Sequence, residues 1–217
     1  LEIARLATDA IKQTHSDPEK EQIFNVAVHR LMDATYQLAM QGDQESIDGL
    51  YGHADSLFAR DPQSRAASEA AWFVARFANE NAQRSAARDI RWLQEFSQQA
   101  RAFADRFPNE QNRAISLLSD AGASCDYHGL TDEAVQCFTS IIQKFPESQQ
   151  AAQVAAPLRR LGLVGKQLDL GGPTLDGGFI QVADFRGAPV LVVFWSTQAK
   201  PFVDQAESII KTVSEAE

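Results

Sequence analysis

Helix-ending signals divide roughly the first three quarters of the sequence into segments of similar length, and this spacing constrains the fold most. Apolar residues recur at helical spacing up to about residue 161, and short turn sequences interrupt the pattern. Prolines stand at three of these turns, at Pro62, Pro108 and Pro146. Each stretch between turns has room for a pair of helices. The sequence therefore predicts a series of helix pairs, each of which buries its apolar face on the next pair.

The expected helices begin at capping residues or prolines and end near glycines or prolines. In the second of them, the expected apolar stripe comprises Ile23, Val26, Ala27, Leu31, Ala34 and Leu38, and in the fifth Ile90 is expected inside. The expected spans are 1–13, 18–40, 44–60, 65–82, 85–106, 112–128, 131–145 and 148–161.

The pair expected over 112–128 and 131–145 carries the most specific pattern, because small and apolar residues recur along both helices and Gly129 separates them. These residues are Leu118, Ala121, Gly122, Cys125, Ala134, Phe138 and Ile141, followed by Pro146. At this spacing the unit resembles a tetratricopeptide repeat, a helix-turn-helix of about 34 residues. Small residues at Gly122 and Ala134 would let the two helices approach closely. The resemblance implies that residues 1–164 form a mainly α, helical-repeat solenoid.

The groove-facing surface of the first helix in such a unit would carry Ser116, Ser119, Ala123, Asp126 and Tyr127. These residues are mostly small and weakly polar, and they lack the lysine or arginine clamp that would hold a peptide carboxylate. The resemblance implies a protein or peptide partner of unknown identity, or packing against a second domain.

A second domain is expected over 165–217, because residues 162–195 hold seven of the twelve glycines. A turn signal at 176–178 between short apolar stretches predicts a β-hairpin. The uninterrupted apolar run Val190–Trp195 predicts an interior strand of a sheet, covered on both faces. A helix is expected over 202–213.

The stretch from the apolar strand through Phe194, Trp195 and Pro201 resembles the first half of the redoxin and TlpA-like thiol-disulfide reductases, which have the thioredoxin fold. Aligned on those residues, the family's two catalytic cysteines fall on Ala199 and Phe202. Neither residue carries a sulfur, so the resemblance implies a domain without dithiol exchange at the usual place. The four positions of the altered motif are Ala199, Lys200, Pro201 and Phe202.

The loop at 195–198 stands before an expected helix N-terminus, where free backbone N–H groups are available for an anion or a peptide carbonyl. We expect it either to bind a ligand through Trp195, Ser196, Thr197 and Gln198 or to pack as an ordinary loop. The later strands of a thioredoxin fold do not follow, so the expected α/β segment is partial and the sequence is expected to be a fragment.

Charge and cysteine usage exclude several classes of protein. The net charge of -9 is spread over the chain, which disfavours nucleic acid and anionic membranes as partners. No apolar run is long enough to span a bilayer. Cys125 and Cys137 fit no zinc or redox motif and are either two buried thiols or a bridge between adjacent helices. The histidines are scattered, so no metal and no cofactor are expected.

Three hypotheses about function follow. The first is a binding or scaffolding protein, made of a helical-repeat domain and a thioredoxin-like domain that is inactive at the dithiol site. The second is a thiol-disulfide oxidoreductase or peroxidase whose cysteines lie beyond residue 217. The third is a peptide-binding helical-repeat protein. The family resemblance implies an extracytoplasmic location, in the periplasm or cell envelope.

Overall fold

A computed structural model describes residues 2–15, 17–163 and 165–193, together with residues 205, 208 and 211. The chain divides into two compact units, Leu1–Val164 and Gly165–Glu217. The described residues are mainly α-helical, as expected for a mainly α protein, and the few strands lie in the second unit.

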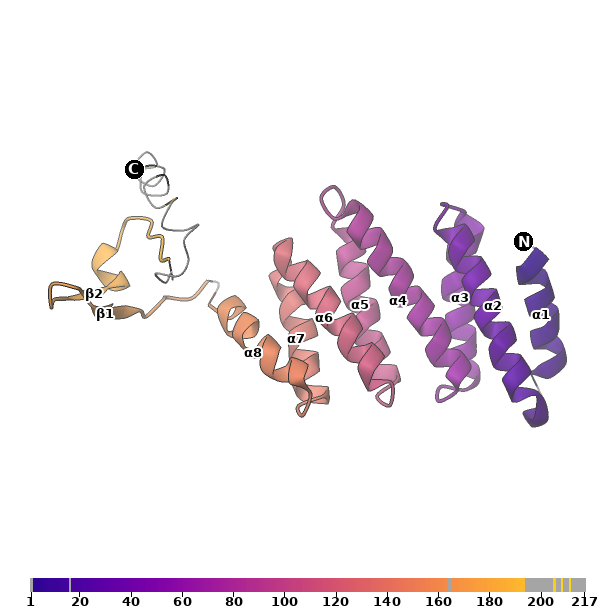
Figure 1. The fold of residues 1–217 in the computed structure, drawn as a ribbon. Coiled ribbons are helices and arrows are strands. Elements are labelled where there is room, and N and C mark those ends of the chain that lie inside the picture. The colour runs from indigo at the N-terminus through magenta and orange to yellow at the C-terminus, as the bar shows by residue number, and fades with distance from the viewer. Residues whose placement is uncertain are drawn as a thin grey trace. The chain divides into compact units, whose positions relative to one another are not determined.

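Consecutive helices of the first unit pack on one another in chain order, as Figure 1 shows. In addition, α2 packs on α4, α4 on α6, α6 on α8 and α5 on α7. Alternate helices therefore make two layers, with α2, α4, α6 and α8 in one of them. The elements are α1 (Glu2–Thr14), the 3-10 helix η1 (Pro18–Lys20), α2 (Glu21–Ala39), α3 (Gln44–Arg60), α4 (Arg65–Ser85), α5 (Arg91–Arg106), α6 (Gln111–Tyr127), α7 (Thr131–Lys144) and α8 (Gln149–Leu161).

Side-chain caps fix three of the helix starts that the sequence predicts. The side chains of Asp43, Ser64 and Ser148 accept hydrogen bonds from backbone N–H groups three residues further on, at 2.9, 3.2 and 3.2 Å. Gly42 and Gly129, which follow α2 and α6, have positive φ angles of 90° and 77°, as helix-ending glycines do. These local signals explain why most bounds agree with the sequence pattern to within a few residues.

The boundary between α4 and α5 differs from the prediction. Helix α4 continues to Ser85 and α5 begins only at Arg91, so Ile90 lies in the turn and is exposed instead of buried. The backbone N–H groups of Arg88 and Asp89 both donate to the carbonyl of Ser85, at 2.7 and 2.8 Å, and thereby close this turn. The turn contains neither glycine nor proline, which is why the sequence pattern did not indicate it.

The apolar stripe predicted for α2 is also partly wrong. Ile23 and Val26 are each 56% exposed, whereas Phe24, Val28 and Met32 are buried. Helix α2 packs on α1, α3 and α4, so its buried band is wider than a single stripe and is centred on a different side. Sequence periodicity alone does not distinguish the two adjacent apolar faces of such a helix.

The core of the first unit consists of two apolar clusters that meet at α4. One cluster gathers side chains of α2, α3 and the first half of α4, and the other runs from α4 to α8. Within the second cluster, α6 and α7 approach closely at Gly122, where an added Cβ would lie 2.5 Å from the Phe138 ring. This contact agrees with the close approach that the small residue predicted.

The second unit begins with the hairpin that the sequence predicts. Strands β1 (Gly171–Pro173) and β2 (Phe179–Gln181) pair antiparallel, with Gly172 opposite Ile180. The turn is closed by the N–H of Thr174, which donates to the carbonyl of Gly178 at 3.0 Å. The 3-10 helix η2 (Val182–Phe185) follows directly.

The interior strand expected from Val190 is not present in the residues that the structure describes. Residues 190–193 have no regular secondary structure, and their side chains are exposed, Leu191 by 60%. The only sheet of the described residues is the short hairpin, so this segment has no neighbouring strand with which to pair. Of the helix expected over 202–213, the three described residues are helical.

Candidate binding groove

A hollow on the layer formed by α2, α4 and α6 has a volume of about 730 Å³ and is lined by three arginines. Helix α2 contributes His29 and Arg30, α4 contributes Arg65 and Glu69, and α6 contributes Arg113. We call this hollow the arginine groove. Its charged side chains come from three helices that lie far apart in the sequence, so only the packing of the helix pairs brings them together.

The centre of the arginine groove is a chain of polar contacts that links the three helices. The Oε1 atom of Glu69 lies 2.9 Å from Nδ1 of His29, and its Oε2 atom accepts a hydrogen bond of 3.1 Å from Arg113. The Glu69 side chain is only 14% exposed. Arg113 also lies over the Trp72 ring, 5.1 Å from its centroid, which holds the guanidinium in place.

Two cations of the arginine groove have no such partner. Arg30 and Arg65 are exposed, and no ion pair joins either of them to another residue in the part of the chain that the structure describes. Their guanidinium groups remain available for an anionic group. This hollow carries three arginines on a protein whose net charge is -9.

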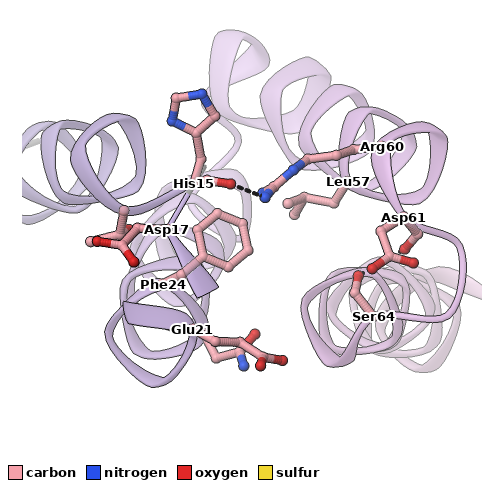
Figure 2. A pocket seen from close by; sticks show the side chains of 10 residues that line it. His15, Asp17, Glu21, Phe24, Leu57, Arg60, Asp61 and Ser64 are labelled. Carbon is pink, nitrogen blue, oxygen red and sulfur yellow. Dashed lines mark hydrogen bonds between the residues drawn. The ribbon is translucent and has the colours of Figure 1, made fainter. Parts of the chain in front are cut away.

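A second hollow of about 340 Å³, which we call the Phe24 pocket, lies between α2 and the turn from α3 to α4 (Figure 2). Arg60 reaches across it and donates a hydrogen bond to the carbonyl of His15. The same guanidinium lies 4.4 Å from the centroid of the Phe24 ring. Figure 2 shows Asp61 and Ser64 across the pocket from Phe24. Arg60 is therefore engaged in holding two segments together.

The carboxylates of the Phe24 pocket are Asp17, Glu21 and Asp61. Asp17 pairs with Lys20 at 2.8 Å, and this contact, with a hydrogen bond from the backbone of Glu19, lowers the pKa of Asp17. Among the described residues no cation pairs with Glu21 or Asp61. This hollow is thus acidic, whereas its neighbour is basic.

The two hollows adjoin, because both are lined by Glu21 and Asn25. Along α2 the acidic hollow comes first and the basic one follows, and the same order holds from Asp61 to Arg65 at the start of α4. We refer to the two adjoining hollows together as the groove, with the Phe24 pocket as its acidic end and the arginine groove as its basic end. Such a surface offers charged and hydrogen-bonding groups to a ligand.

The residues of α6 that the sequence singled out lie elsewhere. Ser116 is exposed and donates to Asp120 at 3.4 Å, Asp126 pairs with Arg160, and Tyr127 is 86% exposed. The hydroxyl of Ser119 is buried without a hydrogen-bond partner. None of these residues lines the groove, to which α6 contributes Arg113 instead.

The sequence pattern did not predict the groove, because the contacts that form it join residues 40 and 44 positions apart in the sequence. Glu69 and Arg113 are 44 residues apart, and so are two hydrogen-bonded pairs of tyrosine and glutamate, Tyr36 with Glu80 and Tyr51 with Glu95. Hydrogen bonds at this spacing relate α2 to α4, α3 to α5 and α4 to α6.

The other predicted site residues fall outside the described part of the chain. Residues 195–202, which include the loop from Trp195 to Gln198 and the four motif positions from Ala199 to Phe202, are not described. The role proposed for them stays a prediction.

Both cysteines are free and buried. The Cys137 thiol lies 3.3 Å from the Ser97 hydroxyl, and the Cys125 thiol donates to the carbonyl of Leu93 at 3.7 Å. Burial raises the pKa of Cys125 to about 12 and raises the pKa of Cys137 as well. Of the two alternatives, the structure has two separate thiols and no bridge, and neither thiol is poised as a nucleophile.

Comparisons with known proteins do not assign this chain to a family. The chain matches no protein-family model, no curated protein and no solved structure. Among the described residues, no three His, Cys, Asp or Glu side chains are grouped to hold a metal ion. Within the same residues, no helix has both the length and the apolar character needed to cross a membrane.

Proposed function

We propose that this protein is a binding or scaffolding protein whose helical unit takes a segment of a partner protein in the groove along α2, α4 and α6. The observation that carries the proposal is the fixed chain of contacts from His29 through Glu69 to Arg113. It organises charged groups of three helices before any partner arrives, and such preorganisation lowers the cost of binding.

The proposal includes a tetratricopeptide-like helical repeat for residues 1–164. The recurrence of cross-helix hydrogen bonds 44 residues apart supports a repeated unit, although it is longer than the 34 or so residues of that repeat. The close contact of Gly122 with Phe138 supports the likeness in the last pair. Stacked helix pairs of this kind present extended surfaces for partner segments.

The proposal also includes a redoxin-like second unit that does not exchange dithiols at its motif positions. It rests on the sequence resemblance alone, in which Ala199 and Phe202 take the places of the two cysteines. The buried, protonated thiols of Cys125 and Cys137 offer no substitute. In an insulin-reduction assay with dithiothreitol, the 217-residue protein should give no rate above background. A rate that persists when both cysteines are replaced by serine would contradict this part of the proposal.

Selection of peptides on the immobilised 217-residue protein tests the binding role. We expect peptides from a random phage-displayed library to be enriched and their affinity, measured by calorimetry, to depend on the groove. Gln22→Trp fills the groove from α2 and should weaken binding at least tenfold. Gln143→Trp, at an exposed position of α7, is the matched control and should leave it unchanged.

Two results would overturn the binding role. One is the absence of any peptide enriched over an unrelated immobilised protein. The other is equal affinity of the selected peptides for the wild type and Gln22→Trp, which would place binding outside the groove.

A further inference from the structure

The charge distribution along the groove restricts the segment that fits it. The negative end carries Glu21 and Asp61 without a cationic partner among the described residues, and the positive end carries Arg30 and Arg65 without an anionic one. All four side chains are exposed and line two adjoining hollows, both of which Glu21 lines. A segment with a single kind of charge would be attracted at one end and repelled at the other.

The remaining charged side chains of the groove are held by other groups of the same chain. Asp17 is paired with Lys20, and Glu69 is held between His29 and Arg113. Arg60 is held by the carbonyl of His15 and the Phe24 ring. Arg60 is thus held by its own chain, although no carboxylate pairs with it among the described residues, and Glu21 lies at the boundary because it lines both hollows.

We infer that the groove recognises a peptide segment carrying an acidic and a basic residue, the acidic one at Arg30 and Arg65 and the basic one at Glu21 and Asp61. This inference rests on the proposed binding role and adds the chemistry of the ligand. The geometry also sets the distance between the acidic and the basic residue of the peptide. Glu21 and Arg30 are nine residues apart on α2, a rise of about 13 Å. An extended peptide advances about 3.3 Å per residue, so a segment that reaches from Glu21 to Arg30 carries its two charges about four residues apart.

The test uses four fluorescein-labelled peptides on a serine and glycine background. The first carries Glu and Lys four residues apart, two others replace one of these residues with Gln, and the last replaces both. Fluorescence anisotropy with the 217-residue protein should rank the doubly charged peptide first. Each charge removed should weaken binding about three- to tenfold, since the contacts are charge-assisted but partly open to solvent.

Charge-removing variants of the protein assign each end. With Arg30→Gln and Arg65→Gln combined, the protein should no longer distinguish the Glu peptide from its Gln counterpart. With Glu21→Gln and Asp61→Asn combined, it should no longer distinguish Lys from Gln. Arg88→Gln and Glu147→Gln, which remove exposed charges outside the groove, are the matched controls and should preserve the full ranking.

The outcomes separate this inference from the binding role. If no peptide of the series binds, or all four bind equally, the charge assignment is wrong. If the phage-selected peptides lack paired charges yet lose affinity in Gln22→Trp, the groove binds segments by other means, and only the inference about their charge fails. The inference about charge would also be overturned if the two combined groove variants still preferred Lys and Glu over Gln in the peptides.

Discussion

Large apolar side chains are mostly buried in the helical unit and mostly exposed in the described part of the second unit. In the helical unit the aromatic side chains of Phe73, Phe77, Phe96 and Phe103 are almost completely buried, because each helix is covered by its neighbours. In the second unit the apolar side chains of the hairpin and of residues 190–193 are exposed, Phe179 by 65%. A helix carries its own backbone hydrogen bonds and needs only a neighbouring helix to bury its face, whereas a strand also needs a partner strand.

This contrast teaches where the stability of the described structure resides. Burial of apolar surface contributes roughly 25 cal/mol per Å², and nearly all of it occurs between helices. A hairpin of two three-residue strands contributes few contacts. Substitutions in the two units should therefore differ strongly in effect, and the following predictions test that difference.

The largest effect is expected for Phe103→Ala in α5. The Phe103 ring is buried and lies 5.2 Å from the Phe107 ring, so its removal leaves a cavity in the larger apolar cluster. We expect a loss of about 3–5 kcal/mol in the free energy of unfolding. Urea denaturation followed by the helical circular dichroism signal measures it, and a loss below about 1 kcal/mol would contradict the assigned core.

A smaller effect is expected for Gly122→Ala in α6, where the new methyl group would overlap the Phe138 ring. Overpacking of this kind destabilises a core by about 1–3 kcal/mol. The matched control is Gly52→Ala in α3, where nothing lies within 4 Å of the added Cβ. Because alanine is the better helix former, the control should be neutral or stabilise by up to about 1 kcal/mol. Effects of the same sign in both variants would argue against the close approach of α6 and α7.

The helical unit should also lose stability at high pH. Burial and the hydrogen bond to Glu80 raise the pKa of Tyr36 from its ordinary value of 10 to about 12. The folded state thus favours the neutral phenol. Its contribution is complete below pH 10 and is lost as the pH rises to about 12.

Tyr36→Phe should make urea midpoints less sensitive to pH across this window, and Tyr127→Phe, at an exposed position, is the control. All three tyrosines lie in the helical unit, so the effect reports on that unit alone. If both variants and the wild type respond equally to pH, Tyr36 does not cause the loss of stability at high pH.

The smallest effect is expected for Phe179→Ala in β2. The ring is mostly exposed, so its removal takes little apolar surface out of a packed environment. We expect a change within about 0.5 kcal/mol in the same urea experiment. A loss comparable to that of Phe103→Ala would mean that the hairpin is covered by a packed surface, and the contrast between the units would fail.

Local signals predicted most helices because the residues that begin and end a helix act within one turn of it. Asp43, Ser64, Ser148 and the glycines after α2 and α6 are such signals. The prediction failed at the turn before Arg91, which has no glycine or proline and where the Asp89 side chain accepts a hydrogen bond from the Arg91 N–H. It also failed where two apolar faces adjoin, on α2. It also failed for the strand from Val190, since β-pairing depends on a partner segment and not on the apolar run itself.

The candidate groove could not be predicted from local pattern. No pattern in the sequence sets Arg30, Arg65 and Arg113 apart from other arginines, and each stands on a different helix. The repeat-like pattern of α6 pointed to a different face of that helix, which carries small polar residues. Only the packing of α2 on α4 and of α4 on α6 puts the three guanidinium groups into one hollow.

The sequence by itself determined that this chain is mainly helical, where its helix pairs turn, that Gly122 permits a close helix contact, and that a hairpin follows residue 170. Periodicity, caps and turn residues act over a few neighbouring positions, so each segment can be interpreted by itself. The tertiary structure decided which face of α2 is buried, that both cysteines remain buried thiols, and which charges meet in the groove. Those outcomes depend on contacts between residues some 40 positions apart, whose geometry is set by how whole helices pack.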